Sequence, residues 1–221
     1  MSNINHYNKI RLKLMVLGLP AAFVSLFLKR RKNLIVFNSF FNLSFNSNTK
    51  YLFLYFLKHR KETVKFVIND DEKRKELTEL YGDHFIETNS FKGKLYALSA
   101  RTWFMNSFEL PVGGIFLKNR INVVCLSHGS PIKNEATLEK DVSLVKRVYY
   151  MILRTNITYM LASGEMFAKV YMKYLHLPKE KILISGLPQY DQFSAEKKET
   201  PVLENSNFSP KFDFYPATKR I

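Results

Sequence analysis

The sequence Val123-Val124-Cys125-Leu126-Ser127-His128-Gly129-Ser130-Pro131-Ile132-Lys133 joins an apolar run to a histidine and a tight turn. The first four residues predict a buried strand, and Gly129 and Pro131 predict a turn directly after it. Similar short apolar runs recur along the chain and alternate with stretches of helical periodicity. This alternation predicts an α/β fold: a Rossmann-like, mostly parallel sheet with helices on both faces.

The same patterns give the approximate bounds of the individual elements. The predicted strands are residues 34–37, 64–68, 85–87, 102–105, 122–126, 157–161 and 181–184. The predicted helices are residues 48–61, 70–81, 92–99, 138–153 and 165–175. Cys125 and Trp103 fall inside predicted strands, so we expect both in the core. Asp70 and Asp71 stand at a strand-to-helix turn, where we expect a helix cap and not a metal site.

Composition excludes several classes of protein. The chain has 221 residues, of which 46% are hydrophobic, so it has enough apolar material for a core and is not a disordered protein. Its single cysteine excludes a disulfide scaffold and favours a reducing compartment. The formal net charge is +15, and the first acidic residue is Glu62. The excess of positive charge is therefore mainly a property of the N-terminal segment.

Residues 14–28 of that segment carry no charge and are bracketed by basic residues. The flanking residues are Lys9, Arg11 and Lys13 on one side and Lys29, Arg30, Arg31 and Lys32 on the other. As a helix the run would be roughly 22 Å long, whereas the hydrocarbon core of a bilayer is about 30 Å thick. Pro20 in its middle also removes a backbone donor. The run is therefore short for a membrane span.

Three interpretations of the segment remain: a secretory signal, a helix buried against the rest of the fold, and an anchor lying in the membrane interface. We favour the anchor, with the seven basic residues held at an anionic membrane surface. Nucleic acid is not an expected partner, because the basic residues bracket an apolar run and do not form a polar stripe. Residues 1–32 are accordingly predicted to be a membrane-associating helix that precedes the α/β domain.

His128 is the candidate catalytic residue. It follows a predicted strand directly, and parallel sheets bind their ligands beyond the carboxyl ends of the strands. Backbone N–H groups in the following turn can hold anionic oxygens, and Lys133 adds a positive charge nearby. A histidine beside such a turn is expected of a general base in phosphoryl or glycosyl transfer. The alternative is a structural histidine that caps the end of the strand.

Three segments carry a resemblance to a known family. Residues 128–133 resemble the His-Gly-Thr-Pro-Leu-Lys motif of the CDP-glycerol:poly(glycerophosphate) glycerophosphotransferases, the polymerases and primases of teichoic acid and related capsules. Residues 38–41 with 48–52 resemble the early loop and Asn-x-Lys-Tyr helix start of that family. Residues 184–191 resemble its Gly-Tyr-Pro-Arg-Asn-Asp segment. The resemblance covers roughly residues 33–193.

The resemblance implies a GT-B-like enzyme of two Rossmann-type domains, of which this chain is the N-terminal, acceptor-side half. The implied substrates are CDP-glycerol and a lipid-linked polymer at the cytoplasmic face of the membrane, with no cofactor and no metal. His128 is implied to be the catalytic base. The implied substrate-binding residues are Ser39, Asn48, Lys50, Gly129, Ser130, Lys133 and Asp191.

The sequence also departs from the family pattern. Ser130 replaces a threonine, whereas Gln189 and Tyr190 replace an arginine and an asparagine, which leaves open another nucleotide-linked donor of a sugar or polyol phosphate. Residues 194–221 are polar, carry three prolines, and are predicted to be a linker that leads to the start of a missing donor domain. We therefore expect a truncated form that is inactive alone. A non-catalytic, membrane-docked acceptor-binding module is the alternative from a different functional class.

Overall fold

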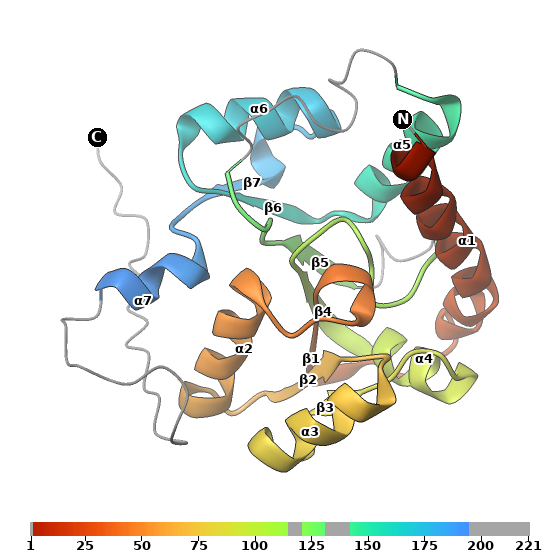
Figure 1. Cartoon of the computed structure of the whole chain (residues 1–221), viewed down its shortest axis with the longest axis vertical. Helices are drawn as coiled ribbons and strands as arrows, with labels where there is room; N and C mark the ends of the chain where they lie inside the picture. The colour runs from red at the N-terminus through yellow and green to blue at the C-terminus, as the bar shows by residue number, and fades with distance from the viewer. Residues whose placement is uncertain (1, 115–120, 131–141, 195–221) are drawn as a thin grey trace.

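The computed structural model describes residues 2–114, 121–130 and 142–194 (Figure 1). These residues form a sheet of seven parallel strands in the order β3-β2-β1-β4-β5-β6-β7. The strands are β1 (Arg31–Asn38), β2 (Thr63–Val67), β3 (Phe85–Ile86), β4 (Ala100–Met105), β5 (Asn122–Cys125), β6 (Tyr159–Ala162) and β7 (Ile182–Ile184). Each overlaps a predicted strand, so the parallel Rossmann-like sheet predicted from the sequence is confirmed.

Helices cover both faces of this sheet (Figure 1). One face carries α2 (Ser47–His59) and α3 (Asp71–Tyr81). The other carries α1 (Ser2–Ser25), α4 (Phe91–Leu98), α5 (Leu144–Asn156) and α6 (Glu165–Leu175), and a short helix, α7 (Asp191–Ser194), follows β7. The sheet is therefore buried on both sides, which explains why its central strands appear in the sequence as continuous apolar runs.

Two cores result, one on each face. Trp103 is fully buried on the α1 side, where its Nε1 donates to the carbonyl oxygen of Ala97 at 2.9 Å. Phe37, Phe53 and Phe66 are fully buried on the α2 side. Cys125 is fully buried as well, and loss of solvation raises the pKa of its thiol to about 12. The expected core roles of Trp103 and Cys125 are confirmed, and the thiol is unreactive at neutral pH.

Capping residues set the start of two helices. Asp70 accepts a hydrogen bond from the backbone N–H of Lys73 at 3.0 Å, so the expected cap of α3 is confirmed. Ser143 caps α5 in the same way, and that helix begins at Leu144 and not at residue 138. Residues 142 and 143 are not helical, and residues 138–141 lie outside the described part of the chain. A serine side chain that bonds the backbone favours a helix start over a helix interior.

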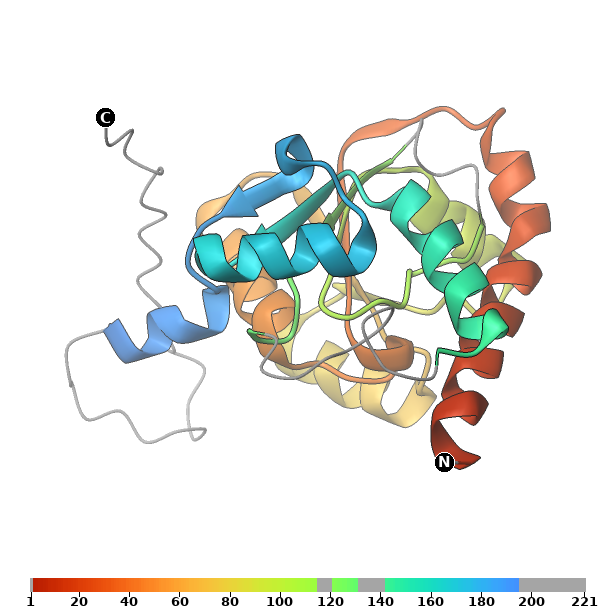
Figure 2. The same ribbon diagram turned by 90° about the horizontal axis from the view of Figure 1, so that it is seen from above.

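Helix α1 packs along α4 and α5 with one of its faces (Figure 2). Met15 and Ala21 on that face belong to the same core as Trp103, and Ala22 is fully buried. The segment 1–32, predicted as a unit of its own, therefore shares its core with the domain that follows. Among the described residues, no helix combines the length and hydropathy that crossing a bilayer requires.

Helix α1 approaches the domain closely at Gly18. A Cβ atom at this position would overlap the backbone of Gly113, which cannot move aside as a flexible side chain can. We expect Gly18→Ala to lower the free energy of unfolding by about 1–3 kcal/mol, as overpacking usually does. The loss would come despite a gain of about 1 kcal/mol in helix propensity. Urea denaturation followed by circular dichroism measures it.

Gly186→Ala is the matched control, because a Cβ atom at Gly186 meets nothing within 4 Å. It should change the free energy of unfolding by no more than about 0.5 kcal/mol. A Gly18→Ala protein as stable as the parent would show that α1 does not pack against residues 112–114 in solution.

Candidate functional site

The candidate site lies at the carboxyl edge of the sheet. Successive strands are added outward toward one side of the sheet from β1 to β3, and toward the other side from β4 to β7. The strand order therefore reverses between β1 and β4. Parallel sheets bind ligands beyond the carboxyl ends of the strands at such a reversal. His128 comes three residues after the end of β5, the strand that pairs with β4. The predicted location of His128 at this edge is confirmed.

The turn that carries His128 is held on both sides of the histidine. Ser127 has a φ of 61°, in the left-handed region that a residue other than glycine rarely adopts. Its hydroxyl donates to the carbonyl oxygen of Gly129 at 2.7 Å and lies 2.8 Å from the hydroxyl of Tyr171. The side chain of His128 is exposed. The backbone of the turn is thus fixed while the imidazole remains open to a ligand.

Asn48 connects the turn to two other segments. Its Nδ2 donates to the carbonyl oxygen of Ser127 at 2.6 Å, and its Oδ1 accepts from the backbone N–H of Gln189 at 3.0 Å. The hydroxyl of Ser47, the residue before Asn48, donates to the Oε1 atom of Gln189 at 2.9 Å. The described parts of the three segments that carry the family resemblance therefore meet here, although they are far apart in the sequence. Asn48 is fully buried, and both ends of its amide bind the protein.

Other candidate residues surround the same turn. Ser130 lies with its hydroxyl 2.7 Å from that of Ser163, which follows β6. A Cβ atom built on Gly129 would meet no atom of the described residues within 4 Å, so these residues leave that side of the turn open. Lys133 lies outside the described residues.

The loop between β1 and α2 forms the wall on the β1 side. Ser39 is fully buried, and its hydroxyl donates to the Oδ1 atom of Asn46 at 2.5 Å. Phe41, Asn42 and Ser47 in or next to this loop have positive φ values, a cluster of backbone strain of the kind found at ligand sites. The sequence patterns gave no sign of this strain, because none of the three is a glycine.

Lys50 and Asp191 are the two charged candidates in the described part of the site. Lys50 is half-buried, and burial lowers the pKa of its ammonium group. Its Nζ atom lies 5.5 Å from the centre of the Phe45 ring, within cation–π range. Asp191 begins α7, and partial burial raises the pKa of its carboxyl group. Both charges are thus less well solvated than on an open surface.

The basic residues of the N-terminal segment do not all face solvent. Lys13, Lys29, Arg31 and Lys32 are exposed. Arg30 is half-buried and donates from Nη1 to the carbonyl oxygen of Ala100 at 2.6 Å, which ties it to the start of β4. The side chains of Lys9 and Arg11 lie outside the described atoms.

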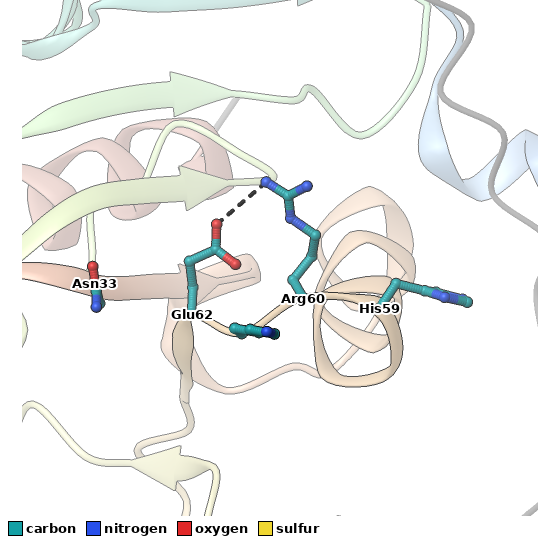
Figure 3. A pocket seen from close by; sticks show the side chains of 5 residues that line it. Asn33, His59, Arg60 and Glu62 are labelled. Atoms are coloured by element: carbon teal, nitrogen blue, oxygen red, sulfur yellow. Dashed lines mark hydrogen bonds and ion pairs between the residues drawn. The ribbon is translucent and has the colours of Figure 1, made fainter.

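A hollow of about 320 Å³ lies at the opposite edge of the sheet (Figure 3). It is lined by residues at the amino ends of β1 and β2, namely Asn33, His59, Arg60, Lys61 and Glu62. Arg60 forms an ion pair with Glu62 at 3.3 Å. Because ligands of parallel sheets bind at the carboxyl edge, we place the candidate site at His128 and not in this hollow.

The sequence profile described as CDP-Glycerol:Poly(glycerophosphate) glycerophosphotransferase matches residues 21–209. A comparison with curated proteins gave no match.

Among solved structures, the wall teichoic acid polymerase TagF matches with a TM-score of 0.65 and 18% sequence identity. The match covers 89% of this chain and 50% of the TagF chain. A histidine variant of TagF soaked with CDPG matches with a TM-score of 0.65 and 17% sequence identity, and this match covers 87% of this chain and 49% of the other. At this identity the likeness shows the fold alone. The chain spans about half the length of the solved structures it matches.

Proposed function

The chain belongs to the CDP-glycerol:poly(glycerophosphate) glycerophosphotransferase family, and we propose that it forms the acceptor side of an enzyme that transfers glycerol phosphate from CDP-glycerol to a lipid-linked polymer. The polymer is a teichoic acid or a related capsular chain. A second, donor-binding domain completes the site.

One observation carries the proposal: Asn48 joins the His128 turn to the segment around Gln189. The described parts of the three stretches that resemble the family motifs are thus connected at the carboxyl edge of the sheet. An exposed histidine on a braced turn is the arrangement that a general base needs, because the base must reach a substrate hydroxyl without moving the backbone.

In the proposed reaction, His128 takes the proton from the acceptor hydroxyl. The hydroxyl oxygen forms a bond to the β-phosphorus of CDP-glycerol, the bond from that phosphorus to the bridging oxygen breaks, and CMP leaves with the bonding electrons. Open backbone at Gly129 leaves room for phosphate oxygens beside the histidine. Release of CMP from CDP-glycerol by an active, longer version of the protein, and its loss on substitution of His128, tests the assignment.

The identity of the donor depends partly on Gln189. Its side chain accepts from Ser47, so it braces the site and supplies no positive charge to a phosphate. This observation favours a second candidate, a related enzyme that uses another nucleotide-linked sugar or polyol phosphate. Competition among CDP-glycerol, CDP-ribitol and UDP-sugars, followed by the nucleotide released, distinguishes the two.

We also propose that α1 holds the protein at the cytoplasmic face of the membrane. The face of α1 that points away from the core carries the exposed apolar side chains of Leu14, Val16, Leu17 and Phe23, and exposed Phe27 lies in the turn that follows the helix. Phe27 is 79% exposed. Contact of so much apolar surface with water is unfavourable in free energy unless another surface covers it. Exposed Lys29, Arg31 and Lys32 follow the helix and suit the headgroups of an anionic leaflet.

The triple variant Leu17→Ser, Phe23→Ser and Phe27→Ser is expected to reduce binding to phosphatidylglycerol vesicles at least about tenfold. Each large apolar side chain contributes about 1.5–3 kcal/mol when it leaves water, and the three residues replaced here do not pack in the core. Vesicle flotation at low and high salt measures the effect.

The control replaces three apolar residues of comparable exposure outside the N-terminal segment, in the variant Leu80→Ser, Leu144→Ser and Met166→Ser. It should float as the parent does. Deletion of residues 1–32 is unsuitable, because it would remove Met15 and Ala21 from the core. Equal flotation of the α1 variant and the parent would contradict the proposed anchor.

A further inference from the structure

Tyr171 connects α6 to the turn that carries His128. It is 3% exposed, and its hydroxyl lies 2.8 Å from the Ser127 hydroxyl. The same hydroxyl donates to the carbonyl oxygen of Gly129 at 3.1 Å. A buried hydroxyl is costly unless it is hydrogen-bonded, and here its partners are the two residues that flank the histidine.

The hydrogen atoms of the two hydroxyls can be assigned without conflict. Tyr171 gives its proton to the carbonyl oxygen of Gly129, which has two lone pairs. Ser127 gives its proton either to the same carbonyl oxygen or to the Tyr171 oxygen. Among the described hydrogen bonds across the turn, removal of the Tyr171 hydroxyl therefore leaves those between Ser127 and Gly129.

The conformation of Ser127 explains why hydrogen bonds within the turn are not enough. A serine at a φ of 61° is strained by roughly 1–3 kcal/mol, so the surrounding structure must hold it there. Asn48 holds the carbonyl side of Ser127 from the α2 face of the sheet, and Tyr171 holds its hydroxyl from the α6 face. His128 lies between the two residues that Tyr171 contacts, and its own side chain is exposed.

We propose that Tyr171 is a positioning residue for His128, acting through the hydrogen bonds that hold Ser127 and Gly129. Its importance for transfer rests on the function proposed above, whereas its effect on the turn does not. Without the Tyr171 hydroxyl the turn samples other backbone conformations, and the imidazole spends less time where it can accept a proton. A displacement of about 1 Å at a reacting group can cost about 10²-fold in rate.

The first test uses the 221-residue chain and needs no activity. We expect Tyr171→Phe to lower the backbone ¹⁵N order parameters of His128 and Gly129 from about 0.85 to below about 0.6. The matched control is Tyr174→Phe, one turn later on α6 and equally buried at 3% exposed. The ring of Tyr174 packs against Phe108, Tyr150 and Tyr171, and a phenylalanine keeps these ring contacts while it removes the hydroxyl. This control should leave both order parameters unchanged.

Unchanged order parameters in Tyr171→Phe would overturn the proposal, whatever the function of the protein. Equal loss of order in Tyr171→Phe and Tyr174→Phe would also overturn it, because the effect would then come from loosening of α6 as a whole. Order lost only in Tyr171→Phe supports it.

The second test uses a longer, active version of the protein. We expect Tyr171→Phe to lower kcat by about 10- to 100-fold with the KM for the donor within about twofold of the parent, since binding groups stay intact. Ser127→Ala should act on the same carbonyl link, so the double variant should lose less activity than the product of the two single losses. A change in KM with kcat unchanged would contradict a shared positioning role. So would a loss of activity in the double variant equal to the product of the two single losses.

Discussion

His128→Ala, in an active and longer version of the protein, is expected to lower CMP release from CDP-glycerol by about 10²–10⁴-fold, the usual contribution of a general base. The fold should stay intact, because the side chain is exposed and the turn is held by its neighbours. The free energy of unfolding should change by no more than about 0.5 kcal/mol. Initial rates of CMP release and urea denaturation of the same preparations measure both.

His128→Gln separates acid–base catalysis from hydrogen bonding. Glutamine keeps polarity and approximate size but does not take up a proton, so it should be as inactive as alanine at every pH between about 6 and 9. A glutamine variant within a few-fold of the parent rate would rule out the role of a base and leave His128 as a phosphate-binding residue. His59→Ala serves as the control, because His59 is exposed at the opposite edge of the sheet.

The strands could be predicted from the sequence because they are buried on both faces. Phe37 and Val123 belong to short apolar runs that only a covered parallel sheet accommodates. The strand order could not be predicted, since nothing local in a run of apolar residues specifies its neighbours. The position of His128 at the carboxyl edge follows from the end of its own strand, and for that reason it was predictable.

The parts of the site that could not be predicted all depend on tertiary contacts. Tyr171 is one of several tyrosines at helical spacing, and only the folded chain brings its hydroxyl to Ser127. Asn48 was identified through the family resemblance as a substrate-binding residue, but its amide hydrogen-bonds the backbone at both ends. The sequence left a buried helix and an interfacial anchor as separate interpretations of residues 14–28, whereas α1 packs one face in the core and exposes apolar side chains on the other.

The 221-residue chain alone is expected to release no CMP from CDP-glycerol above a no-protein control. Transfer requires the donor and the acceptor in one geometry, and such alignment is worth effective concentrations of about 10⁵–10⁸ M. The proposed donor-binding domain would supply half of that geometry, and this chain spans about half the length of the solved polymerases it matches. Among the predicted substrate-binding residues that the structure describes, Lys50 is the one cation, and it is partly buried.

The expected absence of CMP release is informative only if the protein is folded and the acceptor is present. Circular dichroism establishes the fold, and vesicles that carry a lipid-linked primer supply the acceptor. His128→Ala in the same 221-residue chain then controls for contaminating hydrolases, because a contaminant releases CMP equally in both preparations. CMP release that the parent chain shows and this variant lacks would contradict the need for a donor domain. A separate donor domain, added at micromolar concentration, should restore only a small fraction of the rate, because covalent linkage gives an effective concentration in the millimolar range.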